Sequence, residues 1–130
     1  IKNYRAKNKA LESIAFNNKY KLLVAPEVAL KNEDKTYHTI YAKNNIYRFK
    51  ASAKLTAMEF MNEDEILVLQ REFSYVGFKR TIILSKVSLN KCKNNICKCT
   101  LLKKFQSNEE LELDNYEGLT KVSKNKYLMV

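Results

Sequence analysis

The feature that most restricts how this chain can fold is a threefold internal repeat. Residues 11–16, 55–60 and 116–121 align without a gap, and each is followed by a polar stretch and then by a short apolar run. The copies begin 44 and 61 residues apart. A unit of strand, polar turn and apolar strand that recurs roughly every 40 residues is typical of a β-propeller, in which each blade has four strands.

The segments between the copies also have the character of strands. Residues 21–25 and 65–69 are short apolar runs bounded by polar turns, and residues 79–89 and 96–102 are rich in β-forming residues. The Asn pairs at 44–45 and 94–95 suit hairpin turns, the latter a turn of two residues. Helical periodicity is weak except in the first dozen residues and around residues 108–110. We therefore predict an all-β chain in which residues 106–114 form a loop.

These patterns predict a fragment of a β-propeller, about two blades plus the start of a third, in one domain spanning residues 1–130. The repeats start near residues 11, 55 and 116. The third copy reaches Val130 partway through its second strand, and a blade without its neighbour exposes sheet edges and an apolar face. We therefore expect the intact protein to continue. Ile1 opens the chain without the features of a signal peptide, which we expect to reflect processing or excision from a larger protein.

The net charge of +10 raises the question of an anionic partner. Lysines are scattered through every segment, and arginine, the residue with a bidentate fork for phosphate, occurs only at positions 5, 48, 71 and 80. This dispersion favours a solvated basic surface over a nucleic-acid site. A small anionic substrate is the alternative that the charge leaves open. No apolar run approaches the roughly 20 residues needed to span a bilayer, so we expect no membrane span.

Three motifs resemble those of a known family. Residues 11–16 and 23–27 are similar to its pattern FEGLA followed by LLVAxE, residues 66–73 to LLVLERxF with Gln70 in place of Glu, and residues 114–120 to DNxEGLT. In this order they resemble the phytase-like family, described as "esterase-like activity of phytase", from about Leu11 onward. The resemblance implies a secreted or periplasmic propeller that hydrolyses an ester or phosphoester. The family's Asp-rich loop would begin just past Val130.

Glu12 and Glu117 hold the same position in the first and third copies, where the innermost strand of each blade opens. Both carboxylates could therefore point toward the mouth of the central channel. There they could bind Ca²⁺ or activate water as a general base, and we take them as the catalytic candidates. The alternative is that each accepts hydrogen bonds from backbone N–H groups and fixes the local loop. Thr56 holds the middle position, so any such site is asymmetric.

Arg71 and Glu27 also correspond, because each follows the second strand of its repeat. Arg71 could bind a phosphate or carboxylate with two hydrogen bonds, and we take both residues as substrate-binding candidates. A salt bridge from Arg71 to a neighbouring blade is the alternative. Asp114 is a candidate turn cap or a weaker candidate metal ligand.

His38 is the only histidine of the chain, and its position at the start of a strand predicts an exposed side chain. A serine hydrolase triad would have to use it, yet the chain contains no Gly-x-Ser-x-Gly motif. Ser74 follows a strand without any sign of activation. Serine-hydrolase chemistry is therefore not expected in this stretch.

Cys92, Cys97 and Cys99 flank the Asn pair at 94–95. A two-residue turn places Cys92 opposite Cys97 in a non-hydrogen-bonded pair, within reach of a disulfide. Zinc would need four ligands, and no second Cys/His pair is present. We favour a disulfide between Cys92 and Cys97 in an oxidising compartment, with Cys99 free; three reduced thiols are the alternative.

Two functions from different classes follow from these observations. The first is a phytase-like or esterase-like propeller acting on a phosphoester or carboxylester, with Ca²⁺ as a candidate cofactor. The second is a non-catalytic propeller that binds a ligand or a protein partner at the mouth of its channel. A nucleic-acid binder is a third and weaker option, which would show a steep dependence of affinity on salt.

Overall fold

Strands make up nearly all of the regular structure of this computed structural model, which describes residues 3–4, 10–108 and 111–130. Within those residues there are ten strands, one short 3₁₀ helix and no α-helix. The elements are β1 (Leu11–Asn17), β2 (Lys21–Pro26), β3 (Tyr37–Tyr41), β4 (Ile46–Lys50), β5 (Lys54–Phe60), β6 (Glu65–Ser74), η1 (Val76–Phe78), β7 (Lys79–Lys93), β8 (Ile96–Gln106), β9 (Leu119–Ser123) and β10 (Lys126–Met129).

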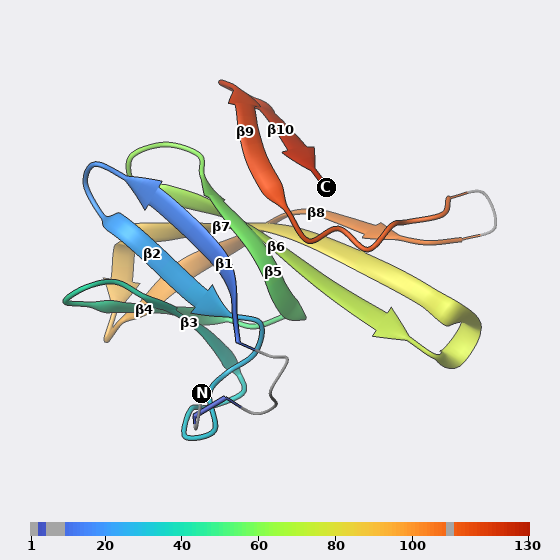
Figure 1. Cartoon of the computed structure of the whole chain (residues 1–130), viewed down its shortest axis with the longest axis horizontal. Coiled ribbons are helices and arrows are strands. Elements are labelled where there is room, and N and C mark those ends of the chain that lie inside the picture. Colours follow the sequence, from blue (N-terminus) through green and yellow to red (C-terminus); the bar gives the residue numbers. More distant parts are fainter. Residues whose placement is uncertain (1–2, 5–9, 109–110) are drawn as a thin grey trace.

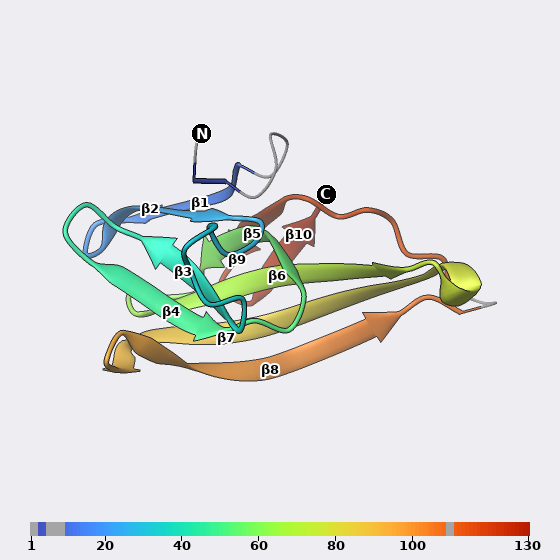
Figure 2. The same cartoon turned by 90° about the horizontal axis from the view of Figure 1, so that it is seen from below.

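The strands form two four-stranded antiparallel meanders and the first hairpin of a third. The sheet order is β1-β2-β3-β4-β8-β7-β6-β5, with β9 and β10 as a separate pair. The two meanders lie face to face, and β1 lies against β5 at their shared edge (Figures 1 and 2). A single parallel bridge, Arg48 to Ile96, joins β4 to β8. The prediction of an all-β chain compatible with a propeller fragment is confirmed.

A β-bulge occurs at the same position in all three repeats. The pairing register shifts between Leu11 and Ser13 in β1 and between Leu55 and Ala57 in β5. Before β9, the N–H groups of Glu117 and Gly118 both donate to the Val130 carbonyl, each at 2.7 Å. The extra residue is Glu12, Thr56 or Glu117 in turn. A bulge bends its strand and re-aims one side chain, which gives this position a shared backbone role.

Gly118 illustrates how tightly the third bulge is built. A Cβ on this residue would come within 2.5 Å of the Val130 side chain. The equivalent residues of the other repeats, Ser13 and Ala57, are themselves small and buried.

The hydrophobic core lies between the two meanders. Blade one contributes buried Ala15, Leu23 and Phe49, and blade two contributes Met58 and Phe60, among others. A second cluster lies between blade two and the third repeat and includes Leu69, Ile82 and Leu113. Each blade therefore buries its apolar side chains against the next blade along the chain.

The outer face of blade one, in contrast, is open. Ile14 and Met58 occupy the same repeat position, yet Ile14 is 64% exposed and Met58 only 3%. Phe16 and Phe60 differ in the same way, at 60% and 7%. Blade one covers Met58 and Phe60, whereas no described residue covers Ile14 and Phe16 to the same extent.

Both Asn pairs lie in hairpin turns, as predicted. Asn94 and Asn95 both have positive φ, 52° and 63°, as a two-residue type I′ turn requires. Between β3 and β4, Tyr41 pairs with Ile46 and the Ala42 N–H donates to the Asn45 carbonyl at 2.9 Å. Of the described residues in the predicted loop 106–114, only Gln106 belongs to a strand. The helical periodicity noted near the N-terminus and around residues 108–110 lies partly outside the described residues. Within the described residues, no helix is long and apolar enough to cross a membrane.

Candidate functional site

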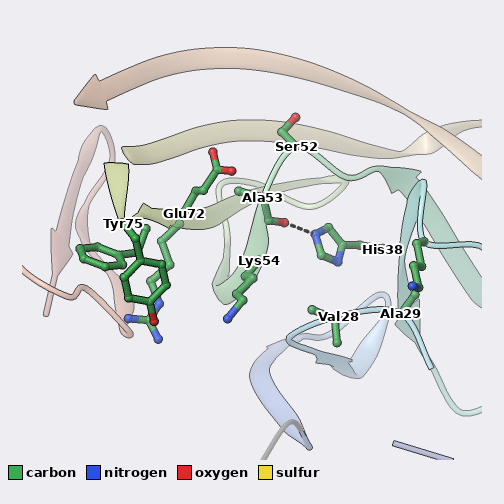
Figure 3. A pocket seen from close by; sticks show the side chains of 11 residues that line it. Val28, Ala29, His38, Ser52, Ala53, Lys54, Glu72 and Tyr75 are labelled. Carbon is green, nitrogen blue, oxygen red and sulfur yellow. Dashed lines mark hydrogen bonds between the residues drawn. The ribbon is translucent and has the colours of Figure 1, made fainter. Parts of the chain in front are cut away.

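A cleft of about 610 Å³ opens where the end of the first repeat meets the second. Its wall includes Lys35, Lys54 and Arg71, the aromatic residues Phe73 and Tyr75, and the edge of His38. Tyr75 and Glu72 lie at one end, His38 at the other, and Lys54 between them (Figure 3). The cleft thus combines three cationic side chains with an aromatic end.

A smaller cleft of about 130 Å³ adjoins the first and shares Lys54, Arg71, Glu72 and Phe73 with it. It adds Arg80, Asp114 and Asn115 from β7 and the connector before β9. The Arg80 guanidinium donates to the Leu113 carbonyl at 2.8 Å, which fixes its position. The linings of the two clefts contain four cationic side chains and two carboxylates, Glu72 and Asp114.

Ion pairs between consecutive repeats position two of these cations. The Lys54 ammonium lies 3.5 Å from the carboxylate of Glu27, which is largely buried. The Arg71 guanidinium donates to Glu117 at 2.9 Å, and Asn115 donates to the same oxygen at 3.0 Å. In each pair a residue from the second strand or just after it contacts the opening of the next repeat: Glu27 directly follows β2, whereas Arg71 lies within β6, which continues to Ser74 and is longer than the sequence predicted. The salt bridge considered for Arg71 is thus present.

Arg71 nevertheless keeps hydrogen-bonding capacity. Its Nε atom is buried and has no hydrogen-bond partner among the described residues. The side chain as a whole is 23% exposed, in a position that lines both clefts. A guanidinium has five N–H donors in a fixed fork, so an anion in either cleft can be bound while Glu117 occupies one donor.

His38 is buried, at 3% exposure, and the prediction of an exposed side chain is wrong. Its Nε2 lies 2.7 Å from the Ala53 carbonyl, which can only accept, so this nitrogen carries the proton. Burial lowers the pKa of His38 from its ordinary value, against smaller opposing effects of the Ala53 carbonyl and the Gln70 side chain. The Gln70 carbonyl oxygen accepts from the N–H groups of Ser52 and Ala53. Together His38 and Gln70 hold the backbone immediately before Lys54.

The two predicted catalytic carboxylates differ in their surroundings. Glu12 is exposed and has no side-chain partner among the described residues, and Glu117 is engaged by Arg71 and Asn115. Both sit on bulges that open innermost strands of different repeats. Of the substrate-binding candidates, Arg71 lines the clefts, whereas Glu27 acts through Lys54. The catalytic role of Glu12 and Glu117 stays a prediction.

The described residues contain no group of three or more His, Cys, Asp or Glu side chains that could hold a metal ion. Asp114 is exposed and lines the smaller cleft with Glu72, beside Lys54, Arg71 and Arg80. Calcium takes six to eight oxygen ligands, and this mixture of two carboxylates and three cations does not fit it.

The three cysteines lie where β7 ends and β8 begins. A disulfide joins Cys92 to Cys97, which are cross-strand partners with Cα atoms 3.8 Å apart, and Cys99 has a free thiol. Burial raises the pKa of the Cys99 thiol. Whether the pair is oxidised in the cell stays a prediction.

Sequence reasoning missed most of the cleft. Lys35, Lys54 and Arg80 are three of many basic residues, and nothing in the sequence separates them from the rest. Phe73 and Tyr75 carry a usable signal, because these two aromatic residues follow closely on the apolar run of β6 and are separated from it by the charged residues 71–72. Their side chains are 43% and 82% exposed.

A propeller-type repeat domain with a basic, aromatic-edged cleft at a blade junction is the class that the fold and the geometry define. The family model for phytase-like proteins, described as "esterase-like activity of phytase", matches residues 2–130. The chain therefore belongs to the phytase-like family. No curated protein and no solved structure matches it.

Proposed function

We propose that this domain is a hydrolase of an anionic ester, with the cleft at the junction of the first two repeats as its substrate site. The family supports phytase-like or esterase-like activity at a general level. The observation that carries the finer proposal is the convergence of Lys54 and Arg71 on one cleft, each fixed by an ion pair to the adjacent repeat.

In this proposal Lys54 and Arg71 bind the anionic group of the substrate, a phosphate or a carboxylate. Glu72 lines both clefts and is exposed, and its side chain leaves β6 on the side opposite to Arg71 (Figure 3), so in this proposal its carboxylate accepts a proton from water that attacks the substrate from the side away from the two cations. Water adds to the phosphorus or carbonyl carbon, the ester bond breaks, and the alcohol leaves with a proton. His38 is a positioning residue, because it acts on Lys54 through the Ala53 carbonyl.

Turnover of p-nitrophenyl phosphate tests the proposal, and p-nitrophenyl acetate, which has no anionic group for Lys54 and Arg71 to bind, is the neutral comparison. We expect Lys54→Ala to raise KM with a smaller effect on kcat, because the residue binds the anion in ground state and transition state alike. Glu72→Gln is expected to lower kcat by roughly 10²-fold or more with little change in KM. Lys43→Ala, which removes an exposed lysine on the turn between β3 and β4, is the matched control and should leave both parameters unchanged.

The same assay separates the competing assignments. Activity that survives Glu72→Gln but disappears in the Glu12→Gln/Glu117→Gln double variant would return the catalytic role to those two carboxylates. A chelator tests whether Ca²⁺ is needed. Anion binding at the cleft without turnover of either ester would favour the non-catalytic ligand-binding propeller.

We infer that the protein works in an oxidising compartment, periplasmic or extracellular. The disulfide between Cys92 and Cys97 supports this inference, since such bonds persist outside the reducing cytosol. Alkylation of the protein as isolated, before any reductant is added, tests it: three reactive thiols would contradict it.

A further inference from the structure

The aromatic end of the cleft is unusual in being uncovered. Phe73 and Tyr75 contact each other edge to face, with ring centroids 5.0 Å apart, and both line the larger cleft. Tyr75 is 82% exposed and Phe73 is 43% exposed. Large aromatic side chains provide most of the apolar contact area at binding sites, and two that share a cleft wall form a surface for a flat ring.

The aromatic pair lies beside the anion-binding groups because of the strand geometry. Arg71 and Phe73 are two residues apart on β6, so their side chains leave the same side of the strand. The Arg80 guanidinium lies 6.0 Å from the centroid of the Phe73 ring. In Figure 3, Tyr75 lies at one end of the cleft and the Lys54 ammonium lies next along it. One ligand can therefore touch the rings and the cations together.

We propose that the cleft binds an ester of an aromatic alcohol, with its phosphate or carboxylate on Lys54 and Arg71 and its ring against Phe73 and Tyr75. The inference rests on the proposed function for turnover, but the preference for an aromatic ring is a binding property and is tested without turnover.

The test compares phenyl phosphate with methyl phosphate by NMR titration of the full chain at fixed salt, at a pH at which both ligands are dianions. Charge and phosphate geometry are then the same, and only the ring differs. We expect phenyl phosphate to bind about tenfold more tightly, which corresponds to about 1.4 kcal/mol. Equal dissociation constants for the two ligands would overturn the proposal.

Variants locate the effect in the cleft. Tyr75→Ala is expected to reduce the preference for phenyl phosphate to about twofold or less and to leave methyl phosphate affinity unchanged, whereas Tyr75→Phe keeps the preference. Lys54→Ala should weaken both ligands equally. Phe78→Ala is the matched control, because Phe78 is an exposed aromatic of the same hairpin that does not line this cleft. A preference that survives Tyr75→Ala, or that is lost in Phe78→Ala alone, refutes the assignment.

Binding and catalysis can fail separately in these experiments. A ring preference without hydrolysis of p-nitrophenyl phosphate would support this inference and contradict the proposed function. Hydrolysis without a ring preference would contradict this inference and support the proposed function.

Discussion

Phe16 and Phe60 offer a matched pair for testing how the repeats pack. They are the same residue type at the same repeat position, on the innermost strands of blades one and two. The perturbation is Phe→Ala at each site in turn. Backbone geometry and chemistry are the same in both cases, and only the cover provided by the neighbouring blade differs.

The expected magnitudes follow from burial. Phe60 is 7% exposed, belongs to the core between the two blades, and stacks on Tyr20 with ring centroids 6.1 Å apart. Removing a buried phenylalanine side chain costs about 3–5 kcal/mol. Phe16 is 60% exposed, so its removal should cost less than about 1 kcal/mol.

Urea unfolding followed by circular dichroism measures the difference. With an m-value of about 2 kcal/mol/M, Phe60→Ala should lower the midpoint by about 2 M and Phe16→Ala by less than about 0.5 M. Similar losses at the two positions would refute the reasoning, because they would mean that the outer face of β1 and β2 is covered in solution. An unchanged midpoint for Phe60→Ala would instead mean that blade one does not pack on Phe60 of blade two in solution.

Three further outcomes are expected. Burial lowers the pKa of His38 in the folded state, so the folded state favours the neutral ring and stability is lost as the pH falls below about 6.5. The urea midpoint of the native chain should therefore be lower at mildly acidic pH than at neutral pH, and this difference should be smaller in His38→Gln. An equal loss in both proteins would contradict this. Alkylation without reductant should label Cys99 alone and, after reduction, Cys92 and Cys97 as well, unless the disulfide is absent. Asn95→Ala should cost about 1 kcal/mol in the free energy of unfolding, because φ there is positive, while Asn95→Gly should not; equal effects would argue against the turn.

The fold could be predicted from sequence because each part of the repeat produces a local sequence pattern. The apolar runs of β2 and β6, the polar turns before them and the Asn pair at 94–95 are each readable over a few residues. The bulge at Glu12 and Thr56 could not be read in the same way. It depends on how two strands pair, and a single extra residue in one strand leaves no mark on composition.

The site was harder to predict because it forms from the ends of separate elements. Arg71 was singled out by its place after a strand, and it does line the clefts. Lys54 gains its role from Glu27 and from the backbone fixed by His38, which are tertiary effects. The burial of His38 was missed for the same reason: its neighbours along the chain are polar, and the residues that cover it come from elsewhere.

The two ion pairs at the blade junctions have opposite polarity. Glu27 of the first repeat pairs with Lys54, whereas Arg71, at the equivalent position of the second, pairs with Glu117. In each pair one partner is well exposed, and ion pairs open to solvent contribute little to stability, about 0.2–1 kcal/mol. A mismatched junction would instead place two like charges together, so the pairs favour one order of blades.

A substitution in the ion pair between Arg71 and Glu117 can distinguish two roles of Glu117, competition with an anion for Arg71 and catalysis. If Glu117 mainly competes with an anion for the Arg71 guanidinium, Glu117→Gln should release donors and tighten phenyl phosphate binding by roughly twofold to fivefold, the equivalent of a surface ion pair. If Glu117 is catalytic, the same substitution should abolish turnover without tightening binding. Measuring the dissociation constant and kcat on the same variant separates these outcomes. Weaker binding in Glu117→Gln would contradict both roles and would instead assign Glu117 to holding Arg71 in its binding position, the role that the ion pair has in the proposed function.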